Sequence, residues 1–221
     1  MAEESVRFPE QVLSEEELDR AKDSRFSPEI HQKLKAASVG IAGLGGLGSH
    51  IAVMLARSGI GHLHLIDFDK VDVTNLNRQV YTTVHLGQPK TKALSRILYE
   101  INPYMKVTWD QARVTQENAA DLLGKYPIVC EAFDDPGQKA MLINTLLESC
   151  PDMTVISGSG MAGYESANTI RTRKIFRRLY LCGDEKTDAY EGIGLMAPRV
   201  SVCAGHQANM AIRLILGYTE V

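Results

Sequence analysis

The loop at residues 43–49, with the sequence GLGGLGS, constrains the fold of this chain more than any other segment. Gly43, Gly45 and Gly48 satisfy the pattern G-x-G-x-x-G, directly after the apolar run of residues 39–42 and before a helix-like stretch. Glycines at such a place allow a tight strand-to-helix turn. They also let backbone N–H groups approach a phosphate at the start of the helix. The loop therefore predicts a nucleotide-binding fold.

Apolar, strand-like runs alternate with helix-like runs over most of the chain. Strands are expected at residues 38–43, 62–67, 105–111, 127–132 and 153–157, and helices at residues 46–58, 89–101, 116–124, 136–149 and 203–216. This alternation predicts an α/β fold with a doubly wound, mainly parallel, Rossmann-like sheet. Ligands of such sheets bind beyond the carboxyl ends of the strands. Gly43, Asp67 and Asp134 are expected at that edge, because each comes at or just after the end of a predicted strand.

Two segments depart from the alternation. Residues 1–24 are expected to form an acidic helical appendage, because Ser14 and Glu17 have the spacing of a capping box. Residues 25–221 would then form a single Rossmann-like domain, entered by a short helix at residues 28–36. Within it, residues 158–200 predict an antiparallel insertion, with β-prone runs at 167–176 and 177–182. The Gly-, Asp- and Glu-rich stretch at 183–194 is expected to be a mobile loop over the nucleotide site.

Composition excludes several classes of protein. The chain has 221 residues, a formal net charge of -3 and 44% hydrophobic residues, which is typical of a soluble globular protein. The charge gives no general attraction to nucleic acid or to anionic membranes. No apolar run approaches the ~20 residues that a membrane span needs, and the acidic N-terminus lacks the order of a signal peptide. A cytoplasmic protein that binds neither nucleic acid nor membrane is expected.

The four cysteines form no C-x-x-C pair. They are Cys130, Cys150, Cys182 and Cys203. A structural zinc site is usually built from closely spaced cysteine or histidine pairs, so these spacings predict no zinc site. Cys130 and Cys150 are expected to be reduced packing residues.

Polar side chains follow the first two predicted strands. Asp67 lies about 20 residues beyond the glycine loop, where a carboxylate can accept a hydrogen bond from a ribose hydroxyl. Asn75 and Arg78 come next. They could form a solvated helical turn capped by Asn75, or present an amide and a guanidinium to a phosphate chain, for which the fork of donors on Arg is well suited.

Two further charged positions are open to a plain and a functional interpretation. Lys90 follows Gly-Gln-Pro at a probable helix start and is either an exposed lysine or a point charge for a leaving pyrophosphate. Asp134 and Asp135 form either a polar loop or a site for Mg²⁺, which prefers one or two carboxylates together with nucleotide phosphates. The Walker Gly-Lys-Ser/Thr sequence is absent, which disfavours a P-loop phosphotransferase.

Read together, these features resemble one family through the order of five motifs. The motifs are GLGGLGS at 43–49, Asp67-Phe68-Asp69, Asn75-Leu76-Asn77-Arg78-Gln79, Gly87-Gln88-Pro89-Lys90 and Glu131-Ala132-Phe133-Asp134. Over residues 25–217 the chain is similar to the enzymes that adenylate sulfur-carrier and ubiquitin-like proteins, the ThiF/MoeB/ubiquitin-activating-enzyme superfamily. Residues 157–175 and 194–210 resemble its short, thiamine-pathway (ThiF-type) branch.

The resemblance implies an ATP-dependent adenylyltransferase. Its substrate would be the C-terminal Gly-Gly carboxylate of a small ubiquitin-like sulfur-carrier protein, and its products an acyl-adenylate and pyrophosphate. The nucleophile has a pKa near ~3.5 and is ionised at neutral pH, so no general base is needed. The site must instead supply positive charge and alignment, because an anion attacks a polyanionic ATP.

The same resemblance implies roles for individual residues. Arg78 and Lys90 would be the catalytic cations, Asp134 the catalytic carboxylate that holds Mg²⁺, and Asp67 the ribose ligand. The expected nucleotide-binding residues are Gly43, Gly45, Gly46, Asp67, Asp69, Asn75, Arg78 and Lys90. The family often adds an arginine from the partner subunit of a homodimer, for which Arg25 is the nearest match. Some relatives also use a covalent cysteine. Cys182 is the candidate here, although an incidental thiol is the favoured interpretation.

Other functions remain open at this stage. A nicotinamide-dependent oxidoreductase would explain the glycine loop but not Arg78, Lys90 and Asp134. A non-catalytic carrier-binding protein would not need these charged residues. Within the same fold, the substrate could instead be a molybdenum-cofactor carrier or a tRNA base, and the modest overall charge makes the tRNA base the less attractive of the two.

Overall fold

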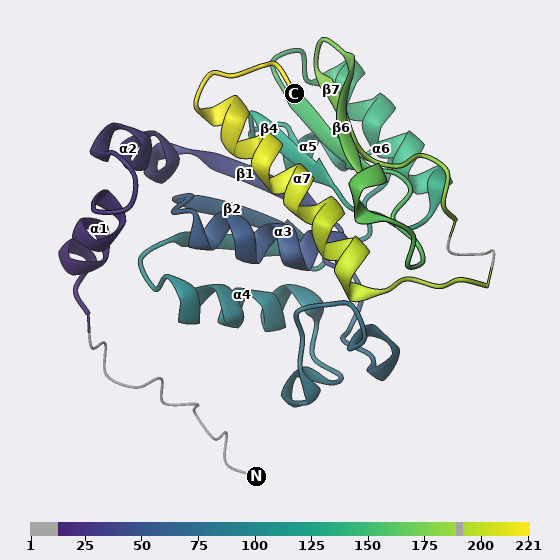
Figure 1. Ribbon diagram of the computed structural model, residues 1–221, viewed down its shortest axis with the longest axis horizontal. Helices are drawn as coiled ribbons and strands as arrows, with labels where there is room; N and C mark the ends of the chain where they lie inside the picture. The colour runs from purple at the N-terminus through teal and green to yellow at the C-terminus, as the bar shows by residue number, and fades with distance from the viewer. Residues whose placement is uncertain (1–12, 189–191) are drawn as a thin grey trace.

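A seven-stranded sheet organises the computed structural model, which describes residues 13–188 and 192–221 (Figure 1). The strands are β1 (Ser38–Ala42), β2 (His62–Ile66), β3 (Lys106–Asp110), β4 (Ile128–Glu131), β5 (Thr154–Gly158), β6 (Arg171–Phe176) and β7 (Leu179–Gly183). Their order in the sheet is β3-β2-β1-β4-β5-β7-β6. Every neighbouring pair is parallel except β6 and β7, which confirms the predicted α/β class and mainly parallel sheet.

Helices cover both faces of the sheet (Figure 1). The helices are α1 (Glu15–Asp23), α2 (Pro28–Ala36), α3 (Gly46–Arg57), α4 (Lys90–Ile101), α5 (Ala119–Leu123), α6 (Pro136–Ser149) and α7 (Ala197–Ile215). Short 3₁₀ turns lie at η1 (Val73–Asn75), η2 (Thr83–His85) and η3 (Ala167–Thr169). The residues of α3, α4 and α7 join one buried apolar cluster and those of α5 and α6 join another, so the sheet is doubly wound.

The central strands are buried on both faces, which explains why their sequences are mainly apolar. Leu63 and Leu65 point into the cluster beneath α3, α4 and α7. Val129 and Val155 point into the cluster beneath α5 and α6. All four side chains are fully buried. Because parallel strands end at one edge, the glycine loop after β1 lies beside the segments that follow β2 and β4.

Capping side chains set where several helices begin. Ser14 and Glu17 form the predicted capping box at the start of α1, and Asp135 accepts a hydrogen bond from the backbone N–H of Gln138 to begin α6. The prediction for the last helix was wrong at its start. This helix, α7, begins at Ala197 rather than at residue 203, because Pro198 occupies a first-turn position where its missing N–H costs nothing.

The predicted antiparallel insertion is confirmed as the pair β6 and β7, with two differences in detail. The run 167–176 is not one strand: residues 167–169 form the 3₁₀ turn η3, where the Ser166 hydroxyl accepts from the backbone N–H of Asn168, and β6 starts only at Arg171. The antiparallel hairpin β6–β7 also does not stand apart, because β7 pairs in parallel with β5 and so extends the main sheet.

Two of the sequence predictions concern segments that lie partly outside the described residues. These are the N-terminal appendage, through residues 1–12, and the mobile loop, through residues 189–191. Within the described ranges, no helix has the length and apolar character that crossing a bilayer requires.

A buried histidine on β2 gives the fold a dependence on pH. The His64 ring stacks on Tyr126 with their centroids 4.9 Å apart, and its Nδ1 lies 2.9 Å from the Thr108 hydroxyl. Burial lowers the pKa of His64 to about 4, outweighing the opposing attraction of the Asp110 carboxylate. The folded protein therefore holds this imidazole neutral.

We expect the free energy of unfolding to decrease as the pH is lowered, because of His64. Above its ordinary pKa of 6.5 the imidazole is neutral in both the folded and the unfolded chain. Between pH 6.5 and about 4 only the unfolded chain takes up the proton, so the free energy of unfolding should decrease by up to about 3 kcal/mol over this window. Urea unfolding of the parent and of His64→Gln at several pH values measures the difference. Equal slopes in the two proteins would show that His64 does not cause it.

A second prediction concerns the close approach of α3 to the glycine loop. A Cβ at Gly48 would collide with the carbonyl oxygen of Gly43, so Gly48→Ala should lower the free energy of unfolding by about 1–3 kcal/mol. The control is Gly205→Ala in α7, where the nearest atom to a new Cβ is the Met54 sulfur at 3.9 Å. That change should stabilise the helix by about 0.5–1 kcal/mol. If urea unfolding shows no loss for Gly48→Ala, the loop is not held as tightly as described.

Candidate functional site

The glycine loop forms an open helix start at the carboxyl edge of the sheet. The Gly43 N–H donates to the Ile66 carbonyl over 2.9 Å, which fixes the loop against the end of β2. Gly45 is the N-cap residue of α3 and offers no side-chain cap, and Gly45 and Gly46 are both partly exposed. The first N–H groups of α3 are therefore available to an anion, where the helix dipole favours negative charge.

Asp67 connects the loop to the charged groups around it. One carboxylate oxygen accepts from the Leu44 N–H over 2.7 Å, and the other accepts from the Asp69 N–H over 2.7 Å. Asp67 is buried, with 8% of its surface exposed. Burial raises the pKa of Asp67, while Lys90 and the two backbone donors act in the opposite direction. The carboxylate thus holds the loop in place at the position expected for a ribose ligand.

Lys90 is buried at this site, so the interpretation as an ordinary exposed lysine is wrong. Its side chain is 7% exposed. The ammonium lies 3.0 Å from Asp69 Oδ2 and 3.9 Å from Asp67 Oδ2. A buried ammonium requires such partners, because an unpaired charge in the interior is costly. The structure therefore brings Asp67, Asp69 and Lys90 together beside the glycine loop.

Arg78 covers the open side of the loop. A side-chain carbon placed on Gly46 would lie 3.7 Å from Arg78 Cγ, so the arginine stem crosses the start of α3. Its Nη1 donates to the Thr74 carbonyl over 2.9 Å and to Asn77 Oδ1 over 2.8 Å. Its Nε is buried without a hydrogen-bond partner. The guanidinium is thus fixed from one side and keeps donors for a further acceptor.

Asn75 belongs to a capping box, but it is not the N-cap residue that its sequence position suggested. Its Oδ1 accepts from the Asp72 N–H over 3.1 Å, in a capping box in which Asp72 rather than Asn75 is the N-cap. Its carbonyl accepts from the N–H of Arg78 over 3.2 Å. Asn75 therefore shapes the turn that carries Arg78, and among the described residues no hydrogen bond joins its amide nitrogen to the glycine loop.

Asp134 lies in the loop after β4, next to the glycine loop. A Cβ on Gly43 would be 3.0 Å from a ring carbon of the preceding Phe133, while the Asp134 side chain itself is exposed. Within residues 13–188 and 192–221, no group of three or more His, Cys, Asp or Glu side chains could hold a metal ion. A single exposed carboxylate fits Mg²⁺ that arrives with nucleotide phosphates and keeps most of its waters.

Arg25 is far from this site within one chain. It is exposed in the turn between α1 and α2, at the end of the sheet where β1 begins (Figure 1). A Cβ on Gly59, just past the C-terminus of α3, would lie 3.5 Å from Lys22 of α1. The α1–α2 corner therefore packs against the end of α3 that is opposite to the glycine loop.

Sequence reasoning gave no role to the buried carboxylate that ends β4. Glu131 is fully buried and accepts from the Phe133 N–H, Lys139 Nζ and Ser157 Oγ over 2.7, 2.6 and 2.6 Å. Gln207 of α7 donates to the Glu131 carbonyl over 3.1 Å. Glu131 thereby ties α6, β5 and the loop before Asp134 together. The sequence did contain a signal for this role, since a carboxylate ends an apolar strand. A carboxylate that is buried in this way must have partners.

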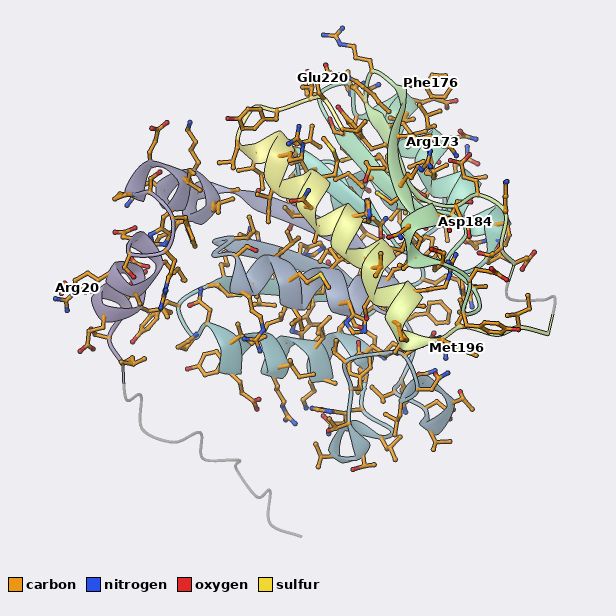
Figure 2. The ribbon with its side chains drawn as sticks, in the orientation of Figure 1. Arg20, Arg173, Phe176, Asp184, Met196 and Glu220 are labelled. Atoms are coloured by element: carbon orange, nitrogen blue, oxygen red, sulfur yellow. The ribbon has the colours of Figure 1, made fainter. Side chains whose placement is uncertain are left out.

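A second missed residue joins α7 to the insertion. Arg199 is 3% exposed and forms an ion pair of 2.5 Å with Asp184, and it donates to the carbonyls of Glu165 and Ser166 over 2.8 Å. Figure 2 shows Asp184 beside α7 and Met196 at the start of this helix. Val200, one residue further, would be 2.9 Å from a Cβ on Gly46. The start of α7 therefore contacts the insertion through Arg199 and the glycine loop through Val200.

Cys182 is poorly suited to act as a nucleophile. It is fully buried on β7, and burial raises its pKa to about 11. A thiol with such a pKa carries little of the reactive thiolate at neutral pH. This agrees with the favoured interpretation of an incidental thiol. The charged groups that the structure gathers at the glycine loop are instead Arg78, Lys90 and the neighbouring carboxylates, next to the α3 start.

Comparison with known proteins finds relatives along almost the whole described chain. The model of the ThiF family matches residues 18–221. The molybdopterin-synthase adenylyltransferase of Salmonella typhimurium is 32% identical over 203 residues, which cover 88% of this chain and 79% of that protein. The sulfur carrier protein adenylyltransferase of Thermus thermophilus is 37% identical over 127 residues, 55% of this chain and 47% of its own length.

Solved structures share the fold. The Escherichia coli tRNA N6-threonylcarbamoyladenosine dehydratase TcdA, in complex with ATP, has a TM-score of 0.83 at 23% identity and covers 93% of this chain and 97% of its own. Escherichia coli MccB with ATP has a TM-score of 0.67 at 28% identity and covers 86% of this chain and 59% of its own. Among the sequence relatives, the alignment with the Thermus thermophilus protein spans about half of that protein's length. The chain belongs to the ThiF family.

Proposed function

We propose that this protein is an ATP-dependent adenylyltransferase that activates the C-terminal Gly-Gly carboxylate of a small ubiquitin-like sulfur-carrier protein. The observation that carries the proposal is the pairing of an uncapped helix start at Gly45 with two cations, Lys90 and Arg78, at the carboxyl edge of the sheet. Family membership adds that two proteins similar to this chain are named adenylyltransferases.

The charges suit an attack on the α-phosphate of ATP. A carrier carboxylate oxygen forms a bond to that phosphorus, the bond to the bridging oxygen of the β-phosphate breaks, and pyrophosphate leaves with the electron pair. No proton moves in this step, since the carboxylate is already ionised. The α3 N–H groups, Arg78 and Lys90 would stabilise the charge that develops on the phosphates. Mg²⁺ held through Asp134 would neutralise the leaving pyrophosphate.

The ribose would bind where Asp67 and Asp69 lie. A ribose hydroxyl would donate to the Asp67 carboxylate, which already accepts from the Leu44 N–H. The same side chain would thus position both the sugar and the glycine loop. Gly43, Gly45 and Gly46 let the backbone approach the nucleotide, and Asn75 supports the turn beside it. This arrangement would favour ATP over a nicotinamide dinucleotide, because hydride transfer has no use for the two cations.

The partner assignment is the finer part of the proposal. The resemblance of residues 157–175 and 194–210 favours a carrier of the thiamine pathway. A molybdenum-cofactor carrier is the second candidate, because the Salmonella relative, named for molybdopterin synthase, aligns over 88% of this chain. We further propose a cytoplasmic homodimer in which the partner subunit's Arg25 reaches the nucleotide, since Arg25 does not reach it within one chain.

ATP–pyrophosphate exchange with a panel of Gly-Gly-ended carriers tests the function. Exchange should appear with at least one sulfur carrier and should require Mg²⁺, and the carrier that gives the highest rate identifies the pathway. If no carrier supports exchange while NAD raises the melting temperature, the oxidoreductase is correct instead.

Substitution of two of the proposed catalytic side chains, Arg78 and Asp134, should remove exchange without unfolding the chain. Arg78→Ala and Asp134→Asn should each lower the rate by about 100-fold or more, as removal of a transition-state donor or metal ligand does. The controls are Arg57→Ala at the far end of α3 and Asp152→Asn before β5, both exposed and away from the glycine loop. Unchanged exchange in Arg78→Ala or Asp134→Asn, with the controls also active, would refute the assigned role.

A further inference from the structure

One face of α3 receives the segment that carries Arg78. Gly46 and His50 are four residues apart in α3, so they lie on the same face of the helix. The Arg78 stem crosses this face at Gly46, where a side-chain carbon would lie 3.7 Å from Arg78 Cγ. One turn further along, the Arg78 carbonyl oxygen lies 3.1 Å from His50 Nε2. Beside it, the Ser49 hydroxyl accepts from the Val80 N–H over a longer distance of 3.4 Å.

The bond to His50 differs in kind from the other hydrogen bonds of Arg78. Among the residues that the structure describes, the guanidinium donates to Thr74 and Asn77, and the backbone N–H donates to Asn75. These partners belong to the same turn as Arg78, so they shift together with it. His50 belongs instead to the helix that starts at the glycine loop. Its imidazole therefore fixes where the arginine lies relative to that loop.

The imidazole acts as a neutral donor. A carbonyl oxygen can only accept, so the proton that faces Arg78 is on Nε2. His50 is partly buried, and burial lowers its pKa, while the hydrogen bond to the Arg78 carbonyl opposes this shift. At neutral pH the ring thus holds the backbone through one N–H group and not through a charge. The Ser201 hydroxyl of α7 lies 3.4 Å from the same nitrogen and is a longer, secondary contact.

We propose that His50 is a positioning residue, which holds the Arg78 backbone so that the guanidinium stays over the start of α3. The inference rests on the proposed function for the role of Arg78, and it adds a residue outside the five sequence motifs. Misplacement of a catalytic group by about 1 Å can cost about 100-fold in rate. His50 therefore contributes to adenylation through Arg78.

ATP–pyrophosphate exchange by the full chain, with the carrier that the parent protein uses, tests this role. The amide nitrogen of Gln reaches about as far from the backbone as Nε2 of His, whereas that of Asn reaches only as far as Nδ1. His50→Gln should therefore keep most of the parent rate. His50→Asn should lower kcat by about tenfold to 100-fold. The KM for ATP should change less, because Lys90 and the α3 N–H groups still bind the phosphates. A full rate in His50→Asn would overturn the role.

A double-mutant cycle with Arg78→Ala separates positioning from a merely structural effect. If His50 acts through Arg78, adding His50→Asn to Arg78→Ala should change neither the residual exchange nor the equilibrium affinity for Mg²⁺–ATP. A residue that only stabilises α3 would lower both by the same factor in either background. Additive losses would therefore overturn the role.

Two substitutions in α7 are the controls. Ser201→Ala removes the secondary contact of the same imidazole and leaves the bond to Arg78. His206→Asn repeats the test substitution at another partly buried helical histidine, whose Nδ1 lies 2.9 Å from the Thr172 hydroxyl. Both variants should exchange at the parent rate. A loss in either one as large as that of His50→Asn would assign the effect to the packing of α7, and would overturn the role.

The outcomes also separate the role of His50 from the proposed function. Exchange in the parent together with a full rate in His50→Asn would keep adenylation and overturn the positioning role. A parent that supports exchange with no carrier would overturn adenylation, and the affinity for Mg²⁺–ATP then decides on His50. A loss of affinity of about twofold to tenfold in His50→Asn, absent in the Arg78→Ala background, would keep the role. An unchanged affinity, or the same loss in both backgrounds, would overturn it.

Discussion

The Asp67 carboxylate is the group on which the site depends. It accepts from the Leu44 N–H and the Asp69 N–H, and it lies 3.9 Å from the Lys90 ammonium. One buried side chain thus connects the glycine loop, the end of β2 and the start of α4. A charge in such a place is tolerated only because it is saturated with donors, which oppose the effect of burial on its pKa. The position of the open α3 start relative to Lys90 follows from these contacts.

Much of the fold could be predicted from the sequence, because local pattern and tertiary structure agree in the sheet. The runs that became β1, β2, β4 and β5 are rich in apolar residues, as strands covered on both faces must be. The ends of the predicted strands were equally informative, since they placed Gly43, Asp67 and Asp134 at one edge of the sheet. The start of α7 was missed because its first turn, Ala197 to Arg199, carries no apolar period; Pro198 and the ion pair of Arg199 determine it instead.

The candidate site was less predictable where a residue's state depends on several elements. The burial of Lys90 requires both Asp67 and Asp69 to face it, and nothing in the spacing of these residues reveals that. Glu131 belonged to a recognised motif, but its partners Lys139 and Ser157 come from α6 and β5. The Arg113 guanidinium stacks over the Phe68 ring although the two residues lie more than forty positions apart in the sequence. Only the pairing of β2 with β3 brings the two together.

The ion pair between Lys90 and Asp69 changes what kind of binding event the site supports. The Lys90 ammonium already has the Asp69 carboxylate as its counter-ion. A polyphosphate that binds here must therefore compete with Asp69 for the ammonium. The free energy gained is the attraction of the ammonium to the polyphosphate minus its attraction to Asp69. This gain is smaller than the attraction that an unpaired ammonium would give. The site would therefore discriminate between anions by their geometry and number of charges, while holding single phosphates weakly.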